Sequence, residues 1–411
     1  SSRSTAPPSS EANRAGTINK GRMINAKHFI LAATKMCTQN PNFSRVGIPL
    51  FSRLPRAKLQ RKTFLMSEVT KIAIIGASGY TGLELLRLVF CHPKAEVVAI
   101  TSRANAGKKV TEVFPRFESH PGTEICFIEP DMESVAATGA EVAFLALPHG
   151  TAAPFARDLL GLGMKVIDLS ADFRLDDPAV YQDFYDHPHP APELLDEAVF
   201  GLPEVYESEI KAARLIASPG CYPTSIMLPL IPLLREGLVE HSSINVSSMS
   251  GVSGAGRKAD LSLIFAEVNE SIRSYGLPRH RHLSEIEQEL GKAAGEKVTI
   301  SFVPHLVPVT AGICTTIFAK LTGDFDRVDE VLRNAYRNAP FVRLRGAGIS
   351  PDTKHVTGSN YLDIGWHHDS RTGRVIVQSA EDNLGKGAAG QAIQSFNLMV
   401  GNIVTDGLQN L

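Results

Sequence analysis

Cysteine is scarce in this chain, and its placement follows no pattern. Five cysteines are scattered over 411 residues, and no two of them form a C-x-x-C pair. An odd, unclustered set argues against a disulfide framework and against a structural zinc site. The run His187-Pro188-His189-Pro190 resembles a metal clip, but no second ligand pair stands at a recognisable spacing. We therefore expect no bound metal.

Long apolar runs are missing as well. The longest, residues 226–234, is too short to cross a bilayer and is interrupted by Pro229 and Pro232. With 43% hydrophobic and 21% charged residues, the chain can still bury a large core and is long enough for two domains. We expect a globular protein with no membrane-spanning segment and no membrane partner.

Acidic residues are nearly absent from the first 65 residues, which hold one acid, Glu11, against twelve lysines or arginines. This segment carries a charge of about +11, so the rest of the chain carries about −12. Few acids among many Ser, Thr and Ala are typical of a transit peptide. A basic arm for nucleic acid is the alternative, but it lacks interleaved aromatics and the body is acidic. We expect residues 1–66 to be a leader outside the fold, with no nucleic-acid partner, and a plastid stroma or, alternatively, mitochondrial destination.

A nucleotide-binding unit is expected to begin near residue 70. The apolar run 71–75 predicts a buried parallel strand, and the leucines of 83–88 predict a helix packed on a sheet. Between them stands G-x-x-G-x-x-G: the first glycine permits a tight turn, the second the approach of a pyrophosphate, and the third close helix packing. The cofactor-binding residues expected in this loop are Gly76, Ser78, Gly79, Tyr80, Thr81 and Gly82.

The next strand points to the kind of nucleotide. Residues 95–100 are expected to form it, and Thr101-Ser102-Arg103 follow. An NAD site usually has an acid about twenty residues after the glycines, to hold the ribose 2′-hydroxyl. Here Ser102 and Arg103 stand in its place, which favours NADP, although Arg103 as a solvated loop residue is the alternative. Further strands at 142–147 and 165–169 end in loops that should face cofactor or substrate.

One cysteine stands in a setting suited to chemistry. Cys221 follows Ser218-Pro219-Gly220 and lies between two strand-like apolar runs, residues 212–217 and 226–234, where a helix is expected to begin. A Pro-Gly turn brings backbone close to a ligand, and the free N–H groups of a helix N-terminus stabilise a thiolate or an oxyanion. From the residue alone, a small buried cysteine is the alternative.

The second half of the chain changes pattern. Strands are expected at residues 242–249, 299–309, 313–321 and 375–379, and helices at 285–294 and 326–338. Strands with few helices between them predict a mixed or antiparallel sheet, hence an α+β domain. The small-residue segment from Asn383 onward is expected to open a helix that runs to the C-terminus and returns to the nucleotide sheet.

His282 and Glu285 are three residues apart and are neighbours if both lie in one helical turn. A carboxylate beside an imidazole orients it and raises its basicity, as a proton-transferring histidine requires. Ser284 with Glu287 also fits a capping box, which would leave His282 just outside the helix. Both alternatives stay open from the sequence.

Together, these motifs resemble the N-acetyl-gamma-glutamyl-phosphate reductases of arginine biosynthesis over about residues 68–411. The resemblance rests on the glycine loop, Ser170-Ala171-Asp172-Phe173-Arg174, Pro219 to Thr224, Gly251 to Arg257, His280-Arg281-His282 and Asn383 to Gly390. It implies a Rossmann NADP-binding domain at 67–220, an α+β catalytic and oligomerisation domain of semialdehyde-dehydrogenase type at 221–379, and a returning C-terminal helix at 380–411. Ser225 departs from the family, which usually has Gly or Ala there.

The same resemblance implies roles for single residues. Cys221 is the expected nucleophile and His282 the acid/base, supported by Glu285. Additional cofactor contacts are expected from Pro148, Ser253, Gly254, Asn383, Lys386 and Gly387. Substrate contacts are expected from Arg174, Ser218, Arg257, His280 and Arg281, with Arg279 a further candidate.

The expected reaction is the NADPH-dependent reduction of N-acetyl-L-glutamyl 5-phosphate to the 5-semialdehyde and phosphate through a Cys221 thioester, in a homodimer or homotetramer. Two alternatives are kept. A semialdehyde dehydrogenase for aspartyl phosphate would be expected to carry a different cysteine box. A non-catalytic NADP sensor on the same scaffold would be indicated by loss of Cys221 or His282, and both are present.

Overall fold

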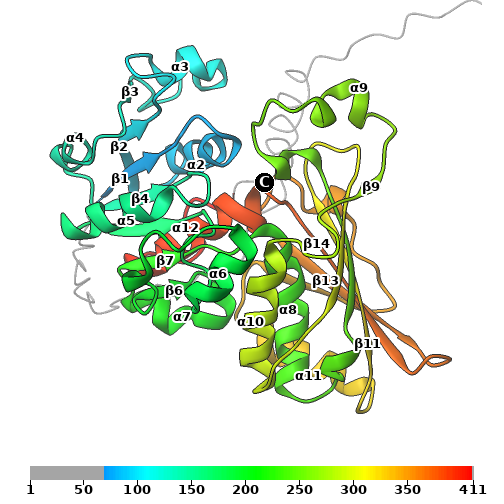
Figure 1. Cartoon of the computed structure of the whole chain (residues 1–411). Helices are drawn as coiled ribbons and strands as arrows, with labels where there is room; N and C mark the ends of the chain where they lie inside the picture. The colour runs from blue at the N-terminus through cyan, green and yellow to red at the C-terminus, as the bar shows by residue number, and fades with distance from the viewer. Residues whose placement is uncertain (1–68, 410–411) are drawn as a thin grey trace, which may run out of the picture. The chain divides into compact units, whose positions relative to one another are not determined.

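The computed structural model describes residues 69–409. The expected leader at residues 1–66 lies outside the described part of the chain. The described part contains two seven-stranded sheets with helices packed against them (Figure 1). Within it, no helix combines the length and apolar character needed to cross a membrane.

The first sheet is parallel throughout. Its spatial order is β3 (Phe127–Ile128), β2 (Ala95–Thr101), β1 (Thr70–Ile75), β4 (Val142–Leu145), β5 (Lys165–Asp168), β7 (Leu215–Ala217) and β6 (Ala198–Phe200). The central strands are apolar on both faces because both faces are buried under helices. The expected strands at 71–75, 95–100, 142–147 and 165–169 all lie in this sheet, so the predicted nucleotide-binding architecture is confirmed.

Helices sandwich this sheet. One face packs against α2 (Tyr80–Phe90), α7 (Pro203–Ala212) and α12 (Gly390–Met399), and the other against α4 (Met132–Ala137) and α5 (Ala152–Gly161). The C-terminal segment does return to the sheet, since Phe396 of α12 lies 5.8 Å from Phe144 of β4 between ring centroids. The helix ends at Met399, however, and does not reach the C-terminus, where Gly401 adopts a positive φ of 74°.

The second sheet is mixed. Its order is β12 (Val342–Ala347), β13 (Leu362–Asp369), β14 (Arg374–Glu381), β11 (Ile313–Lys320), β8 (Asn245–Ser250), β10 (Ser301–Leu306) and β9 (Arg273–Ser274). One face packs on α8 (Cys221–Arg235), α10 (His282–Ala294) and α11 (Asp326–Tyr336). On β11 the alternate residues Thr316 and Phe318 point to the other face and stay partly exposed. The predicted α+β domain is therefore confirmed. Within residues 69–409 the remaining α-helices are α3 (Val110–Val113), α6 (Pro178–Tyr185) and α9 (Phe265–Val268).

The apolar run 226–234 is helical, and its interpretation as strand-like was wrong. It forms the middle of α8, which contains Pro229 and Pro232. A proline has no N–H for the carbonyl four residues earlier, here those of Ser225 and Leu228. The Ser379 hydroxyl donates to the Ser225 carbonyl at 2.6 Å, and the Tyr336 hydroxyl donates to the Leu228 carbonyl. Side chains from the packed neighbours thus replace both missing bonds.

Candidate active site

Two cavities meet at Cys221. The larger has a volume of about 590 Å³ and lies between loops that follow strands of both sheets. The smaller, of about 160 Å³, extends toward the N-terminus of α2 and the segment after β14. Cys221, Arg174 and His282 line both cavities. The chain therefore places these three side chains where two bound molecules would meet.

The turn before Cys221 is shaped by the histidine beside it. Cys221 is the first residue of α8, and Gly220 is its N-cap in an extended conformation. A Cβ at position 220 would lie 2.5 Å from His282 Nε2, so only glycine lets the imidazole pack against this turn. On the other side, a Cβ at Gly387 would lie 2.8 Å from Cys221 Cβ. The thiol is thus held between two glycines.

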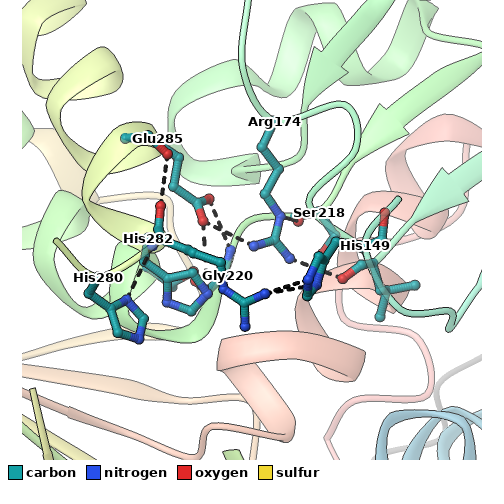
Figure 2. Close-up of polar contacts among 12 residues, drawn as sticks. His149, Arg174, Ser218, Gly220, His280, His282 and Glu285 are labelled. Atoms are coloured by element: carbon teal, nitrogen blue, oxygen red, sulfur yellow. Dashed lines mark hydrogen bonds and ion pairs between the residues drawn. The ribbon is translucent and has the colours of Figure 1, made fainter. Parts of the chain in front are cut away.

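His282 begins α10, so both His282 and Glu285 lie in the first helical turn. The capping box of Ser284 does not form, because the Ser284 hydroxyl donates to the Arg281 carbonyl. Glu285 Oε1 is 4.0 Å from His282 Nε2 and accepts a bond from Arg174 Nη1 at 3.0 Å. Its Oε2 accepts the Gly220 N–H at 3.1 Å, and Figure 2 shows this group of side chains. Glu285 therefore ties the histidine, the arginine and the cysteine turn together.

Burial dominates the ionisation of these groups. Burial raises the pKa of Cys221 to about 12, with the Glu381 carboxylate as the next cause, against the opposing effect of the Tyr222 backbone N–H. Burial and the nearby His280, Arg174 and Arg281 hold the pKa of His282 well below its usual range. Burial thus opposes the helix N-terminus in setting the ionisation of Cys221, the expectation of a thiolate there stays a prediction, and the lowered pKa of His282 favours its neutral form.

The arginines expected at the substrate separate into distinct groups. The Arg174 guanidinium is buried and donates to the carbonyls of Ser218 and Leu169 as well as to Glu285. These contacts give Arg174 a structural task at the junction of the cavities.

Arg281 lines the large cavity and contacts the His149 ring. Arg257 donates to the Ser78 carbonyl in the glycine loop at 3.2 Å, which places it beside the loop expected to bind the cofactor. Arg279 pairs with Asp183 on α6 and does not line the large cavity.

Three other site residues were expected at the substrate or cofactor. His280 lines the large cavity, and its Nδ1 accepts the His282 N–H at 3.2 Å. Pro148 also lines that cavity. Ser218 lines the small one, and its hydroxyl is buried without a hydrogen-bond partner among residues 69–409.

Sequence reasoning missed several residues of the large cavity. Lys258 and Arg273 line it, and so does a tyrosine pair, Tyr222 and Tyr275, whose hydroxyls are 2.9 Å apart. The sequence did indicate Lys258, because this lysine directly follows the Gly251 to Arg257 motif. Nothing local marks Tyr275, which reaches Tyr222 across 53 positions of sequence.

The glycine loop has the geometry that a dinucleotide requires. Gly76 has a φ of +83°, and a Cβ on Gly82 would lie 2.6 Å from the backbone of Ala77. Gly79, the N-cap of α2, faces open space. At the end of β2 the Ser102 hydroxyl donates to the Ser78 hydroxyl at 3.1 Å, and Arg103 is exposed. No acid occupies the position that would oppose a 2′-phosphate.

The small cavity is lined by segments that lie far apart in the sequence. Thr81, Ser253, Gly254, Asn383 and Gly387 all line it. Asn383 Nδ2 donates to the Ser253 hydroxyl at 2.9 Å, and its Oδ1 accepts the Gly312 N–H at 2.7 Å. Five of the residues expected at the cofactor therefore line the small cavity, and one of them, Thr81, follows directly on Gly76, Ser78, Gly79 and Tyr80 of the glycine loop.

Lys386 is the exception. Its side chain is fully buried, and its Nζ lies 2.6 Å from Glu204 Oε1 and 2.8 Å from Gln394 Oε1. It points away from the small cavity, which Leu384, Gly387 and Ala388 line instead. The Lys386 side chain therefore neutralises a buried carboxylate of α7 and is not among the side chains that line the small cavity.

Two family models cover most of the described chain. Residues 71–213 match the semialdehyde dehydrogenase NAD binding domain, and residues 221–383 match the semialdehyde dehydrogenase dimerisation domain. Among solved structures, aspartate semialdehyde dehydrogenase II of Vibrio cholerae has a TM-score of 0.62 at 18% identity, covering 82% of this chain and 99% of that one. The NADP-containing enzyme of Candida albicans has a TM-score of 0.61 at 18% identity, covering 81% and 98%. These structures show the shared fold.

Curated relatives are much closer in sequence. N-acetyl-gamma-glutamyl-phosphate reductase of Akkermansia muciniphila is 58% identical over 340 residues, which are 82% of this chain and 98% of that protein. The reductase of Geobacter metallireducens is 51% identical over 344 residues, with 83% and 98% covered. With its glycine loop, its cysteine at the junction of two cavities and these relatives, the chain belongs to the N-acetyl-gamma-glutamyl-phosphate reductase family.

Proposed function

We propose that this protein is an N-acetyl-gamma-glutamyl-phosphate reductase of arginine biosynthesis. It converts N-acetyl-L-glutamyl 5-phosphate and NADPH into N-acetyl-L-glutamate 5-semialdehyde, NADP and phosphate. The observation that carries the proposal is Cys221, which lines both the large cavity and the smaller cavity leading to the glycine loop. The aspartyl alternative is disfavoured, because aspartate semialdehyde dehydrogenases are only 18% identical whereas the glutamyl reductases reach 58%.

Cys221 is assigned as the nucleophile. Its sulfur attacks the acyl carbon of the bound acyl phosphate, and the carbon–oxygen bond to phosphate breaks; the phosphate leaves and takes up a proton from solvent, and a thioester remains on Cys221. We assign the N–H groups in the first turn of α8 to the stabilisation of the negative charge that develops on the carbonyl oxygen, because Cys221 is the first residue of this helix. The positive end of the α8 dipole adds to this stabilisation.

His282 is assigned as the proton-transfer group. Its Nε2 packs against Gly220, immediately before the nucleophile. Because its low pKa keeps the imidazole neutral, it can accept the thiol proton during attack and return that proton to the sulfur when the aldehyde leaves. Glu285 supports the imidazolium that forms in between, and Arg174 fixes Glu285. Both of these act as positioning residues.

The residues present fit NADPH. Gly79 is open at the N-terminus of α2, and the strand-end position that would carry an acid in an NAD site holds Ser102. The glycine loop would hold the pyrophosphate, Arg103 the 2′-phosphate, and Ser253 with Asn383 the nicotinamide end. NADPH, when bound, supplies the hydride that reduces the thioester.

The large cavity is proposed to bind the acyl phosphate. Arg281, Lys258 and Arg273 line it, and all three are cationic side chains suited to a carboxylate and a phosphate. Because planar guanidinium binds such groups through two N–H donors, we assign the substrate carboxylate and phosphate to Arg281 and Arg273 with Lys258 as a third charge.

Two broader properties are part of the proposal. Residues 221–383 match a dimerisation domain, and β11 presents partly exposed Thr316 and Phe318 on the sheet face opposite the helices, so we propose a homodimer or homotetramer assembled on this face. Light scattering on the purified protein measures the mass. The basic leader supports import into plastids, with mitochondria as the alternative, and an import assay with both isolated organelles distinguishes them.

The test runs the reaction backwards, with phosphate, NADP and either N-acetylglutamate semialdehyde or aspartate semialdehyde. We expect phosphate-dependent NADPH formation with the N-acetylated substrate. Cys221→Ser should abolish turnover while NADPH still binds, because a hydroxyl lacks the thiolate population that attack requires. If that variant keeps more than about a tenth of the wild-type kcat, roughly 1.4 kcal/mol of barrier, the covalent mechanism is wrong. Preference for aspartate semialdehyde would refute the proposed substrate.

A further inference from the structure

An acidic side chain outside the expected site lies beside the nucleophile. Glu381 is the last residue of β14, and it is fully buried. Both of its carboxyl oxygens lack a hydrogen-bond partner among residues 69–409. Buried carboxyl groups are normally bonded, because an unsatisfied one is costly. An orphaned carboxyl group at this position therefore calls for a functional explanation.

Its distance from Cys221 follows from the glycine that separates them. A Cβ built on Gly387 would lie 3.0 Å from Glu381 Oε1 and 2.8 Å from Cys221 Cβ. Both atoms are thus close to one point, and they are less than about 6 Å apart. A charge at that range and in a buried setting acts strongly on a neighbouring ionisation.

The buried cation that acts on Glu381 is itself paired with another acid. Lys386 opposes the rise in the pKa of Glu381, but its ammonium is bonded to Glu204, which makes that pair neutral. Asp382, next in sequence, is satisfied by the N–H groups of Gly358, Leu384 and Gly385. On the other side of Cys221, Arg174 is paired with Glu285.

His282, the remaining group near the thiol, is neutral. Ionised Glu381 would therefore place a net negative charge next to Cys221. The direction of the pKa values agrees, since burial raises the pKa of Glu381 well above its usual range and Glu381 helps to raise that of Cys221.

We propose that Glu381 is a positioning residue that competes with the Cys221 thiol for a single negative charge. When Glu381 is protonated, Cys221 can ionise and attack. When Glu381 ionises as the pH rises, its carboxylate suppresses the thiolate, so the rate of attack rises less with pH than it would for an isolated thiol. In the free enzyme the proton lost from the pair goes to solvent, whereas during turnover the thiol proton goes to His282, and no further reactant is needed. Two acids at this separation titrate as a pair and not as independent groups.

The test measures the thiol directly, by the rate of Cys221 alkylation with iodoacetamide between pH 6 and 10, in the free enzyme. Glu381→Gln has the same shape but no charge, so it should lower the thiol pKa. At pH 8 to 9 we expect alkylation to be about tenfold faster than in the wild type, which corresponds to one pKa unit. The limb of the kcat profile that rises with thiol ionisation should move to lower pH in the same variant.

The control is Asp363→Asn, which neutralises a buried carboxylate of the same sheet that is paired with Arg343. It should leave the alkylation profile unchanged. The wild-type protein gives a second measurement that does not depend on folding of a variant: its alkylation rate should rise less than tenfold per pH unit, as coupled acids require. A single-proton curve in the wild type that is unaltered in Glu381→Gln would overturn the inference.

This inference rests on the proposed function only for the role of Cys221 in turnover. The alkylation profile needs neither substrate nor cofactor. Absence of reductase activity would therefore refute the proposed function and leave the coupling measurable, whereas an unchanged profile in an active enzyme would refute the coupling alone.

Discussion

At the scale of single residues, cofactor choice depends on the exposed side chain of Arg103 at the end of β2. Arg103→Ala should raise the KM for NADPH about tenfold or more and leave the KM for NADH nearly unchanged, because only the 2′-phosphate gives the guanidinium a charge-assisted pair. Steady-state kinetics with both cofactors measures this. Arg116→Ala, at another arginine of the same domain in the short turn after α3, is the matched control. An equal rise in KM for both cofactors would show that Arg103 does not contact the 2′-phosphate.

Residue by residue, the sequence could indicate the chemistry but not the support around it. Cys221 after Pro-Gly, and His282 three positions before Glu285, are local patterns, and the structure brings all three together. The partners of Glu285 could not be predicted, because Arg174 and Gly220 lie 111 and 65 positions away in sequence. The surroundings that raise the pKa of Cys221 could not be predicted for the same reason: local reasoning sees the helix terminus and not the distant segments packed around the thiol.

Ser225 illustrates how a departure from a family pattern is accommodated. Its hydroxyl is buried, donates to the Tyr222 carbonyl and lies 2.8 Å from the Thr315 hydroxyl, which in turn lies 2.8 Å from that of Ser248. A hydroxyl added at this position is therefore satisfied by the adjoining sheet, at little cost in stability.

At the scale of elements, α8 depends on bonds from outside the helix. Tyr336→Phe removes the donor to the Leu228 carbonyl that Pro232 leaves free. The buried carbonyl then lacks a partner, which should lower the free energy of unfolding by about 1–3 kcal/mol. Urea denaturation measures the change. Tyr361→Phe is the control, because Tyr361 is only partly buried and its ring packs on Phe341 at 5.7 Å between centroids. A loss for Tyr336→Phe no larger than for the control would contradict this account of α8.

Several elements of the second sheet resisted prediction for identifiable reasons. Strand β13 contains Gly365, and glycine inside a strand argues against the assignment. Its presence has a tertiary cause, since a Cβ there would lie 1.9 Å from the Ile349 carbonyl oxygen. Strand β12, at the edge of the sheet, carries the charged Arg343 and Arg345 and ends in Gly346 and Ala347. The prolines of α8 argue against a helix in the sequence, yet the helix forms. The side chains that replace the missing hydrogen bonds come from distant segments and could not be foreseen.

At the scale of the whole molecule, the segment after β14 joins the two sheets at the active site. It begins with Glu381 in the second sheet, continues through Asn383 and Gly387 along the small cavity, and ends as α12 on the first sheet (Figure 1). The site therefore depends on both sheets and on this segment at once. In the sequence this segment simply follows all the other elements. Only the fold shows that it lies between Cys221 and the glycine loop.

The anchor of this segment is the buried pair of Lys386 and Glu204, with side chains that are 0% and 2% exposed. Lys386→Met should lower the free energy of unfolding by about 3–5 kcal/mol, because the Glu204 carboxylate then stays buried without its cation. Urea or thermal denaturation measures the loss.

The control is an exposed ion pair on the same helix. Lys211→Met removes the exposed partner of Glu207 on α7 and should lower the free energy of unfolding by less than about 1 kcal/mol. The double variant Lys386→Met with Glu204→Leu should recover most of the loss, since no uncompensated charge remains. Equal stabilities of Lys386→Met and Lys211→Met would mean that the buried pair does not anchor the segment, and that the packing of α12 on the first sheet holds it in place alone.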